Sequence, residues 1–193
     1  MEKNLTLIEV IFPKIENKIL ILVRDLVLVF SFAILTGLCA KLKIEIGPVP
    51  ITMQTFSVLL SGALLGAKRG ALSQITYLSM GFAGIPWFSR GGGMAYLLSL
   101  TFGYLVGFVF ASFFVGFLCQ KGFDRKLGRA IFAMFFGNLL IYLPGLFWLG
   151  RFVGPEKVLV VGFFPFVLGD VLKIILAGSI LPLAWKILKV KKS

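Results

Sequence analysis

The chain has 193 residues, of which 59% are hydrophobic, and its mean hydropathy is +0.99. Soluble domains contain about 45–50% apolar residues, so this composition excludes an ordinary water-soluble protein and predicts one compact membrane bundle. The net charge of +12 does not indicate nucleic-acid binding, because the basic residues stand at the ends of hydrophobic runs and no zinc-finger or RNP-like pattern is present. With no His and no Cys cluster, a zinc site is excluded.

Six hydrophobic segments predict an all-α membrane protein with six transmembrane helices in one compact bundle. The second and third segments are shorter than the ~20 residues that span a bilayer comfortably. The bundle is expected over residues 19–186, after an amphipathic cytoplasmic lead-in at 1–18 and before a basic cytoplasmic tail at 187–193. The expected segments are 19–40, 51–66, 71–87, 97–118, 130–149 and 158–185.

The distribution of Lys and Arg predicts the orientation of these segments. Fourteen basic residues fall on the side of the two termini, five fall on the other side, and Lys173 lies within a segment. Basic residues accumulate in cytoplasmic loops, so both termini are expected in the cytoplasm. The loops 41–50, 88–96 and 150–157 then face outward.

The first segment carries small residues four positions apart, Ala33 and Gly37. Such spacing lets another helix approach closely. The sequence leaves two interpretations open: internal packing within the bundle, or a docking surface for a second membrane protein.

The outward loop "GIPWFSRGGGMAY" (84–96) combines aromatic, basic and glycine residues. Its aromatic residues have two interpretations, as anchors at headgroup depth or as part of a ligand site. The glycine run fits an anchor poorly, because glycines allow close backbone approach and lid motion. Backbone N–H groups and a guanidinium suit a carboxylate. The candidate binding residues here are Trp87, Phe88, Arg90, Gly91, Gly92 and Gly93.

Several polar residues lie at membrane depth within the predicted segments. Gln and Asn side chains often join neighbouring helices, so each residue alone is more often structural than ligand-binding. The candidates are Gln54, Gln74, Tyr77, Tyr104, Asn138 and Tyr142. Gln54, Asn138 and Tyr142 stay unassigned between helix packing and cavity lining.

The last segment contains "PFVLGDVLKIILAG" (165–178), with Asp170 and Lys173 three residues apart. Residues at this spacing share one helix face, and a charge at the membrane centre costs about 2.5–3.5 kcal/mol. The pair is either an internal ion pair that locks the bundle or part of a cavity in which Asp170 accepts hydrogen bonds from a polar ligand. Intramembrane ionisable residues favour the functional interpretation.

Taken in order, "PVPITMQTFSVLLSGALLGAKRGALSQITYLSMGFAGIPWFSRGGG", "TFGYLVGF" and "FVLGDVLK" resemble the BioY family, over about residues 30–180. Members of this family are biotin-binding S components of energy-coupling factor transporters. The chain departs from a Pro-Thr-Gly-Gly-Tyr element of the family, where it has Leu100, Thr101, Phe102, Gly103 and Tyr104.

The resemblance implies a six-helix S component that binds biotin from outside and docks on a transmembrane T component driven by two ATPase subunits. It implies that Asp170 and Lys173 form the ligand-facing pair and that Ala33 and Gly37 form the docking face. Trp87, Phe88 and Tyr77 would then pack on the biotin rings, while Arg90 or the glycine N–H groups would hold the carboxylate tail. The expected location is the cytoplasmic (inner) membrane of a bacterium, with lipid around the bundle and with no cofactor.

Two other classes of function remain as alternatives. A stand-alone secondary carrier for biotin or a related vitamin is the first, although no convincing internal repeat is present. A membrane-embedded enzyme is the second, and it lacks the acid–base pair or metal cluster that it would need. The sequence also has no GxxxxGK[ST] loop, so concentrative uptake requires ATPase partners.

Overall fold

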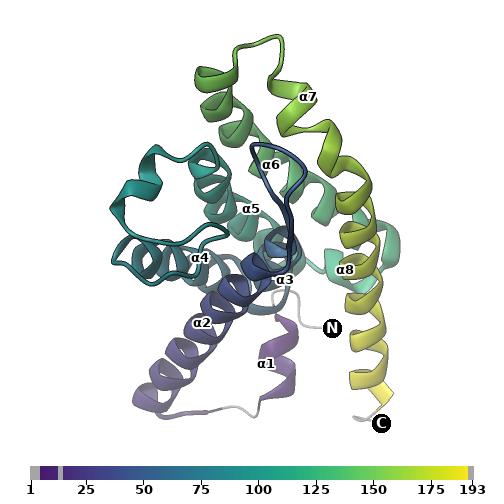
Figure 1. Ribbon diagram of the computed structural model, residues 1–193. Helices are drawn as coiled ribbons and strands as arrows, with labels where there is room; N and C mark the ends of the chain where they lie inside the picture. The colour runs from purple at the N-terminus through teal and green to yellow at the C-terminus, as the bar shows by residue number, and fades with distance from the viewer. Residues whose placement is uncertain (1–4, 13–14, 191–193) are drawn as a thin grey trace.

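The computed structural model describes residues 5–12 and 15–190, which form helices, one short hairpin and the loops that connect them (Figure 1). Two 3₁₀ turns, η1 and η2, stand in loops. The helices are α1 (Leu7–Ile11), α2 (Lys18–Lys41), α3 (Gln54–Leu65), α4 (Ala67–Phe82), α5 (Phe102–Gln120), α6 (Leu127–Val153), α7 (Val158–Gly162) and α8 (Phe164–Val190). The strands are β1 (Lys43–Ile44) and β2 (Ile51–Thr52), and the 3₁₀ turns are η1 (Met94–Leu98) and η2 (Phe123–Arg125).

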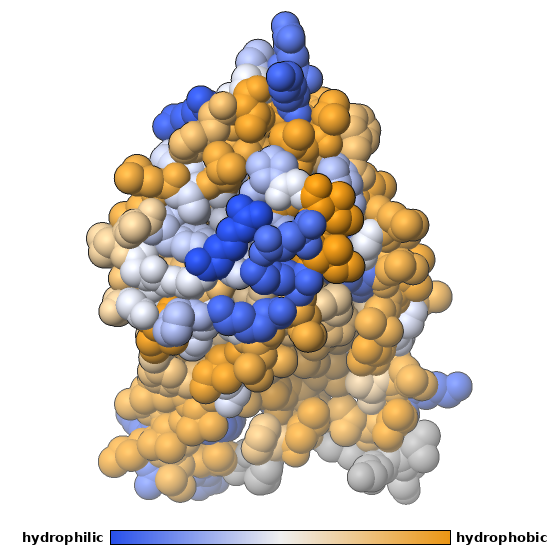
Figure 2. Space-filling model, viewed as in Figure 1, coloured by the Kyte–Doolittle hydropathy of each residue, from blue (hydrophilic) through white to orange (hydrophobic). Residues whose placement is uncertain are grey.

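Four helical stretches in the described part of the chain are long and apolar enough to cross a membrane. They are Lys18–Lys41, Phe102–Gln120, Leu127–Val153 and Val158–Leu188. Figure 2 shows the broad hydrophobic surface that such helices present, with hydrophilic residues over the β1–β2 hairpin and at the two ends of the molecule. The predicted all-α membrane class is therefore confirmed.

Several predicted segment boundaries are wrong. The third segment begins at Ala67 rather than 71, and the fifth spans Leu127–Val153 rather than 130–149. Three further errors lie at the outward loops. The second segment begins at Gln54 rather than 51, because Ile51 and Thr52 pair with Ile44 and Lys43 in an antiparallel hairpin. The third segment ends at Phe82 rather than 87, and the fourth begins at Phe102 rather than 97. The residues between them form a loop because Gly84, Gly91 and Gly93 adopt positive φ angles, which end helical geometry and which glycine tolerates without strain.

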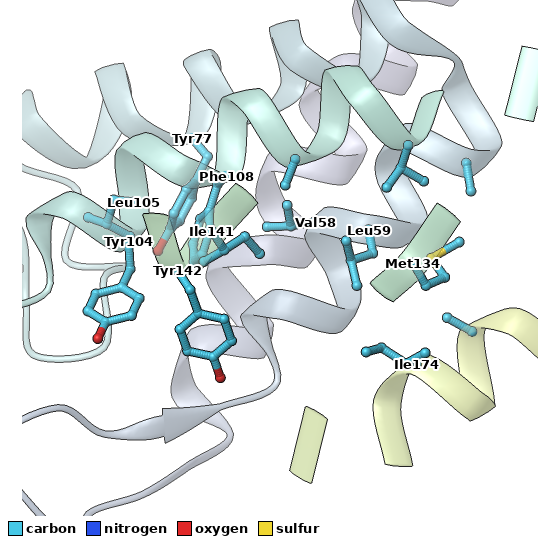
Figure 3. Packing of buried hydrophobic residues seen from close by; sticks show 14 of the residues in the cluster. Val58, Leu59, Tyr77, Tyr104, Leu105, Phe108, Met134, Ile141, Tyr142 and Ile174 are labelled. Atoms are coloured by element: carbon cyan, nitrogen blue, oxygen red, sulfur yellow. The ribbon is translucent and has the colours of Figure 1, made fainter. Parts of the chain in front are cut away.

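The centre of the bundle is built on small residues that bring helices into close contact. A Cβ atom on Gly62 of α3 would collide with the backbone carbonyl oxygen of Ser112 in α5, and one on Gly107 would lie 2.7 Å from the Cα of Ile141 in α6. Without a hydrophobic driving force in lipid, such van der Waals contacts stabilise helix pairs. Around them lies a buried apolar cluster that includes Val58, Leu59 and Met134 (Figure 3).

A polar seam joins α2, α3, α4 and α5 inside this core. The side-chain amide of Gln74 donates to Ser61 Oγ at 3.0 Å and to Thr36 Oγ1 at 3.4 Å, and Ser61 bonds to Ser112 at 2.9 Å. Gln74 is fully buried, and interhelical bonds of this kind satisfy polar groups that lipid cannot. This seam supports a packing role for Gln74.

The chain places α1, the beginning of α2 and the end of α8 at one end of the molecule, whereas the α6–α7 loop lies at the other (Figure 1). Asn17 caps α2 by accepting a hydrogen bond from the backbone N–H of Ile19 at 2.8 Å. Between α7 and α8 the helix breaks at Phe163, whose φ is −128° and ψ −63°. Pro165 follows in the first turn of α8, a position where proline is tolerated.

Candidate functional site

A narrow cavity of about 50 Å³ lies between α3, α5, α6 and α8, beneath the β2 strand and the 84–101 loop. Sites for small molecules usually measure about 300–1,000 Å³. The cavity in this conformation is therefore smaller than a typical ligand site. The lining residues are Val49, Pro50, Thr52, Gln54, Thr55, Ser89, Tyr96, Thr101, Tyr104, Leu105, Phe108, Ile141, Tyr142, Phe166, Asp170 and Lys173.

The Asp170 carboxylate is the acceptor at the centre of the site. It is 5% exposed and receives hydrogen bonds from three side chains. Asn138 Nδ2 donates to Oδ2 at 2.8 Å, Tyr142 donates its hydroxyl to the same oxygen, and Lys173 Nζ donates to Oδ1 at 3.2 Å. A buried carboxylate needs hydrogen-bonding partners, and α6 supplies two of the three donors while α8 supplies the third.

Lys173 connects the buried carboxylate to the loop above it. Besides Asp170, its ammonium donates to the backbone carbonyl oxygen of Thr52 at 2.7 Å and to Thr55 Oγ1 at 3.0 Å. An ammonium has three donors, and all three are engaged. A ligand that takes a hydrogen bond from Lys173 must therefore replace one of these partners, and Thr52 belongs to the β1–β2 hairpin.

The site retains unused acceptor capacity on its α6 side. A carboxylate offers about four lone-pair positions, and Asp170 uses three of them. The side-chain oxygen of Asn138 is buried and has no hydrogen-bond partner among the described residues. Donors from a ligand would satisfy both groups, and a buried polar atom without a partner favours such an occupant.

Arg90 bridges the two outward loops instead of lining the cavity. Its guanidinium donates to the carbonyl oxygens of Pro48 at 3.0 Å and Gly47 at 3.3 Å, and it lies 3.9 Å from Glu45. A hydrogen bond from Lys43 and its charge lower the pKa of the Glu45 carboxyl. Because the Arg90 side chain is 40% exposed, a ligand carboxylate can reach it from the solvent side.

The glycine run, residues 91–93, determines the backbone conformation of the 84–101 loop. The N–H of Gly91 donates to Phe88 and the N–H of Gly93 donates to Gly81, at 3.3 and 2.7 Å. A Cβ atom on Gly92 would collide with the carbonyl oxygen of Ile85. Two of the three N–H groups that the sequence offered to a carboxylate are thus bonded to backbone oxygens.

Tyr77, Trp87 and Phe88 form an aromatic cluster beside the cavity. Tyr77 and Phe88 are fully buried and meet edge to face with ring centroids 5.3 Å apart. The indole N–H of Trp87 donates to the Tyr77 carbonyl oxygen at 2.9 Å, and Gln54 donates to the Tyr77 hydroxyl at 2.8 Å. Of these four residues only Gln54 lines the cavity; the others support its wall.

Tyr104 and Tyr142 project their hydroxyls to the same side of the bundle, away from Val58 and Leu59 (Figure 3). Both rings line the cavity. Their hydroxyls have different partners, since Tyr104 donates to the carbonyl oxygen of Gly162 at 2.8 Å whereas Tyr142 donates to Asp170. The two residues therefore contribute similar surfaces but different hydrogen bonds.

The small residues of α2 face the interior of the chain. Ala33 is fully buried, and a Cβ atom on Gly37 would lie 3.1 Å from the Trp87 side chain. In this conformation Ala33 and Gly37 pack against other parts of the bundle. A partner protein can therefore contact them only if α2 moves. Its role in docking stays a prediction.

Sequence reasoning missed the hydroxyl-bearing residues that complete the site. Thr52 and Thr55 hold Lys173, and Ser89 bonds to the Tyr96 hydroxyl at 2.9 Å. Lys41, at the end of α2, was also missed; its ammonium donates to the carbonyl oxygens of Pro86 and Phe88. The usable signal was the position of Thr52 and Thr55 at the start of a predicted helix that faces the outward loops.

The sequence pattern of the BioY family matches residues 7–190. The "Probable biotin transporter BioY" of Pyrococcus horikoshii is 40% identical over 151 residues, which cover 78% of this chain and 89% of that protein. The "Biotin transporter BioY" of Thermotoga maritima is 37% identical over 161 residues, with coverage of 81% and 93%.

A solved structure is also similar: the crystal structure at 2.1 Å of the S-component for biotin from an ECF-type ABC transporter. It superimposes with a TM-score of 0.75 and 26% sequence identity, covering 94% of this chain and 96% of that one. With the family pattern and these relatives, the chain belongs to the BioY family.

Proposed function

We propose that this member of the BioY family captures biotin from outside the cell and delivers it inward as the S component of an energy-coupling factor transporter. Family membership and the biotin-transport function of its relatives support this proposal. The observation that carries it is the buried Asp170–Lys173 pair at the wall of a cavity covered by the β1–β2 hairpin and the 84–101 loop. The chain is then a transport protein without a cofactor and without catalytic residues.

Biotin offers two ureido N–H donors, one ureido carbonyl, an apolar thioether ring and a carboxylate tail. A ureido N–H suits the free acceptor position of Asp170 or the unpartnered oxygen of Asn138. The ureido carbonyl accepts from Lys173 in place of the Thr52 carbonyl, which frees the β1–β2 hairpin to rearrange. Tyr104, Tyr142 and Gln54 line the space that the rings would occupy.

The carboxylate tail is assigned to the outer loop. Arg90 supplies a charged donor near the solvent, and the loop of Gly91, Gly92 and Gly93 supplies close backbone approach. Trp87, Phe88 and Tyr77 are proposed to face the rings only after the loop rearranges, since none of them lines the present cavity.

The proposed topology has six membrane-crossing helices with both termini in the cytoplasm, in the cytoplasmic membrane of a bacterium and surrounded by lipid. The charge count supports it, with fourteen basic residues on the side of the termini against five on the other. Two of the six, α3 and α4, are short, which leaves room for the β1–β2 hairpin and the 84–101 loop. The segments 1–18 and 187–193 are proposed to flank the bundle on the cytoplasmic side; residues 1–4, 13–14 and 191–193 of these segments lie outside the described residues.

Transport requires partners in this proposal, namely a T component and two ATPase subunits. The test of capture is equilibrium binding of biotin to the purified chain in detergent without partners, beside biotin methyl ester and desthiobiotin. Tight binding of biotin is expected, with weaker binding of the ester. Absence of biotin binding by the folded protein would overturn the proposal.

Uptake in cells separates this function from a stand-alone carrier. Cells that express the chain but lack the ATPase subunits are expected to bind biotin without accumulating it. Accumulation against a gradient under those conditions would favour the secondary carrier.

A further inference from the structure

A second, larger groove lies between α2, α4 and α5, at the end of the molecule where α1 lies and α2 begins. It encloses about 930 Å³, at the upper end of the range of small-molecule sites. Its residues are distinct from those of the cavity at Asp170. Its long apolar part is formed by Leu22, Leu26 and Phe30 of α2, Leu72 of α4, and Phe113 and Phe117 of α5.

The groove opens sideways along membrane-spanning helices. Leu22, Leu72, Phe113 and Phe117 are each between 43% and 60% exposed although they line a concave surface. From Lys68 to Thr76 the floor follows two turns of α4, about 12 Å at 1.5 Å per residue. The groove therefore offers a membrane-facing channel with the length of a substantial part of an acyl chain.

The mouth of the groove is charged, and its acidic groups are already neutralised. Asp25 pairs with Arg24 at 2.8 Å and with Arg69 at 3.2 Å, and Arg69 also pairs with Glu9. A carboxylate in an ion pair repels an anion less than a carboxylate without a cationic partner does. The same ion pairs hold the guanidinium groups of Arg24 and Arg69 at the end of the groove. This network of ion pairs forms a polar boundary at the charged end of the apolar groove.

Two further cations, one lining the groove and one beside its wall, have no acidic partner in the described part of the chain. Lys68 lines the groove and is exposed. Lys121 lies 4.1 Å above the ring of Phe117, a wall residue. Basic sites between helices near the cytoplasmic surface bind anionic lipid headgroups. An acyl chain in the apolar channel places its phosphate near these two ammonium groups.

We propose that this groove is a binding site for one anionic phospholipid, with an acyl chain between α2, α4 and α5 and its headgroup phosphate held by Lys68 and Lys121. The apolar channel and these two cations together select this occupant over a neutral lipid. The site is separate from the proposed biotin cavity, and occupancy by lipid fixes α2 against α4 and α5.

The test measures lipid binding by the full chain. The protein is purified in detergent and stripped of lipid, and it is then titrated with dioleoylphosphatidylglycerol or with dioleoylphosphatidylcholine. Native mass spectrometry counts the bound lipids. One phosphatidylglycerol is expected to bind at concentrations where phosphatidylcholine does not. The Lys68→Gln/Lys121→Gln variant is expected to lose about tenfold or more in affinity for phosphatidylglycerol, since each basic residue near a membrane surface contributes about 1 kcal/mol. Its affinity for phosphatidylcholine stays unchanged.

Matched controls separate the groove from the general surface. Leu72→Trp fills the channel and is expected to abolish retention, whereas Leu168→Trp, on an exposed position of α8 outside the groove, retains the lipid. Lys157→Gln removes an exposed cation at the opposite end of the molecule and also retains it. Each variant is accepted only if its thermal unfolding matches that of the parent chain.

Three outcomes would overturn the proposal. The first is equal retention of the two lipids by the parent chain, which indicates an unselective lipid shell. The second is unchanged retention in the Lys68→Gln/Lys121→Gln variant. The third is unchanged retention in Leu72→Trp together with lost assembly with partner subunits, which assigns the groove to a partner's helix. A biotin titration of the same samples reports on the proposed function independently.

Discussion

Lys173 donates a hydrogen bond to the backbone carbonyl oxygen of Thr52 at 2.7 Å, across 121 positions of the chain. The same ammonium pairs with Asp170 at 3.2 Å. The buried charge pair of α8 and the β1–β2 hairpin above it are therefore one connected unit. A ligand that competes for Lys173 also competes with the hairpin, which links occupancy of the cavity to the covering loop.

The first prediction tests whether Asp170 and Lys173 bind the ligand or only stabilise the fold. Lys173→Met leaves Asp170 buried without its cation, and loss of one partner of a buried pair costs about 3–5 kcal/mol. The melting temperature in detergent and the biotin affinity are both expected to fall. The double variant Asp170→Asn/Lys173→Met removes both charges and is expected to recover stability without recovering binding. Normal biotin affinity in the double variant would make the pair purely structural.

The second prediction concerns the donors that hold Asp170. Tyr142→Phe removes a hydrogen bond to a charged acceptor, an interaction of about 1.5–3 kcal/mol. Biotin affinity is expected to fall about tenfold, because each 1.4 kcal/mol corresponds to one factor of ten. Tyr104→Phe is the matched control, since it lines the same cavity but donates to Gly162. Equal losses in both variants, measured by calorimetry, would argue against a specific role for Tyr142.

The third prediction tests where the carboxylate tail lies. Arg90→Gln is expected to weaken biotin binding about tenfold, comparable to the loss of a charge-assisted hydrogen bond, while binding of biotin methyl ester changes little. Lys43→Gln removes a neighbouring cation that pairs with Glu45 and should leave the preference for the acid intact. If acid and ester weaken together in Arg90→Gln, the residue acts by joining the two loops.

The fourth prediction addresses the small residues of α2. Gly37→Leu drives a side chain into Trp87, and overpacking of this kind costs about 1–3 kcal/mol. The isolated chain is expected to melt at a lower temperature and to bind biotin more weakly. Ser31→Leu enlarges an exposed position of the same helix and should change neither property. A Gly37→Leu variant with normal stability and biotin binding, but with lost assembly with the T component, would favour the docking interpretation.

Hydrophobic runs predicted where the helices lie, because lipid exposure demands long apolar stretches with internally bonded backbones. The same signal misplaced the ends of the third and fourth segments. The residues wrongly included in these segments, 83–87 and 97–101, contain apolar side chains such as Ile85 and Leu98, which lie in the loop at 37% and 76% exposure. Hydropathy does not distinguish an apolar residue of a loop from an apolar residue of a membrane-spanning helix.

The candidate site was predictable to a similar extent. A charged pair inside an apolar helix identified Asp170 and Lys173, since such residues need a physical reason to be there. The hydroxyls of Thr52 and Thr55 carry a weaker signal, namely their position at the start of a predicted helix, because a Thr side chain in a membrane bundle often serves helix packing. Spacing alone likewise set Ala33 and Gly37 on one face of α2 without giving the direction in which that face points.

The last prediction concerns Asp124, in the loop between α5 and α6. Its carboxylate is fully buried and accepts a hydrogen bond from the indole of Trp185 near the end of α8. Its other oxygen has no hydrogen-bond partner among the described residues. Burial raises the pKa of Asp124 to about 6, although the bond from Trp185 opposes the shift.

A raised pKa in the folded state means that the folded protein binds the proton more tightly than the unfolded chain. This contribution to stability is fully present below pH 3.8, the ordinary value for this carboxyl. It is lost as the pH rises to about 6, and linkage sets its size at roughly 2–3 kcal/mol. Asp124→Asn keeps an acceptor for Trp185 but cannot titrate. The melting temperature of the parent chain relative to this variant is therefore expected to fall between pH 4 and pH 7. A constant difference across that range would show that Asp124 does not change its protonation on unfolding.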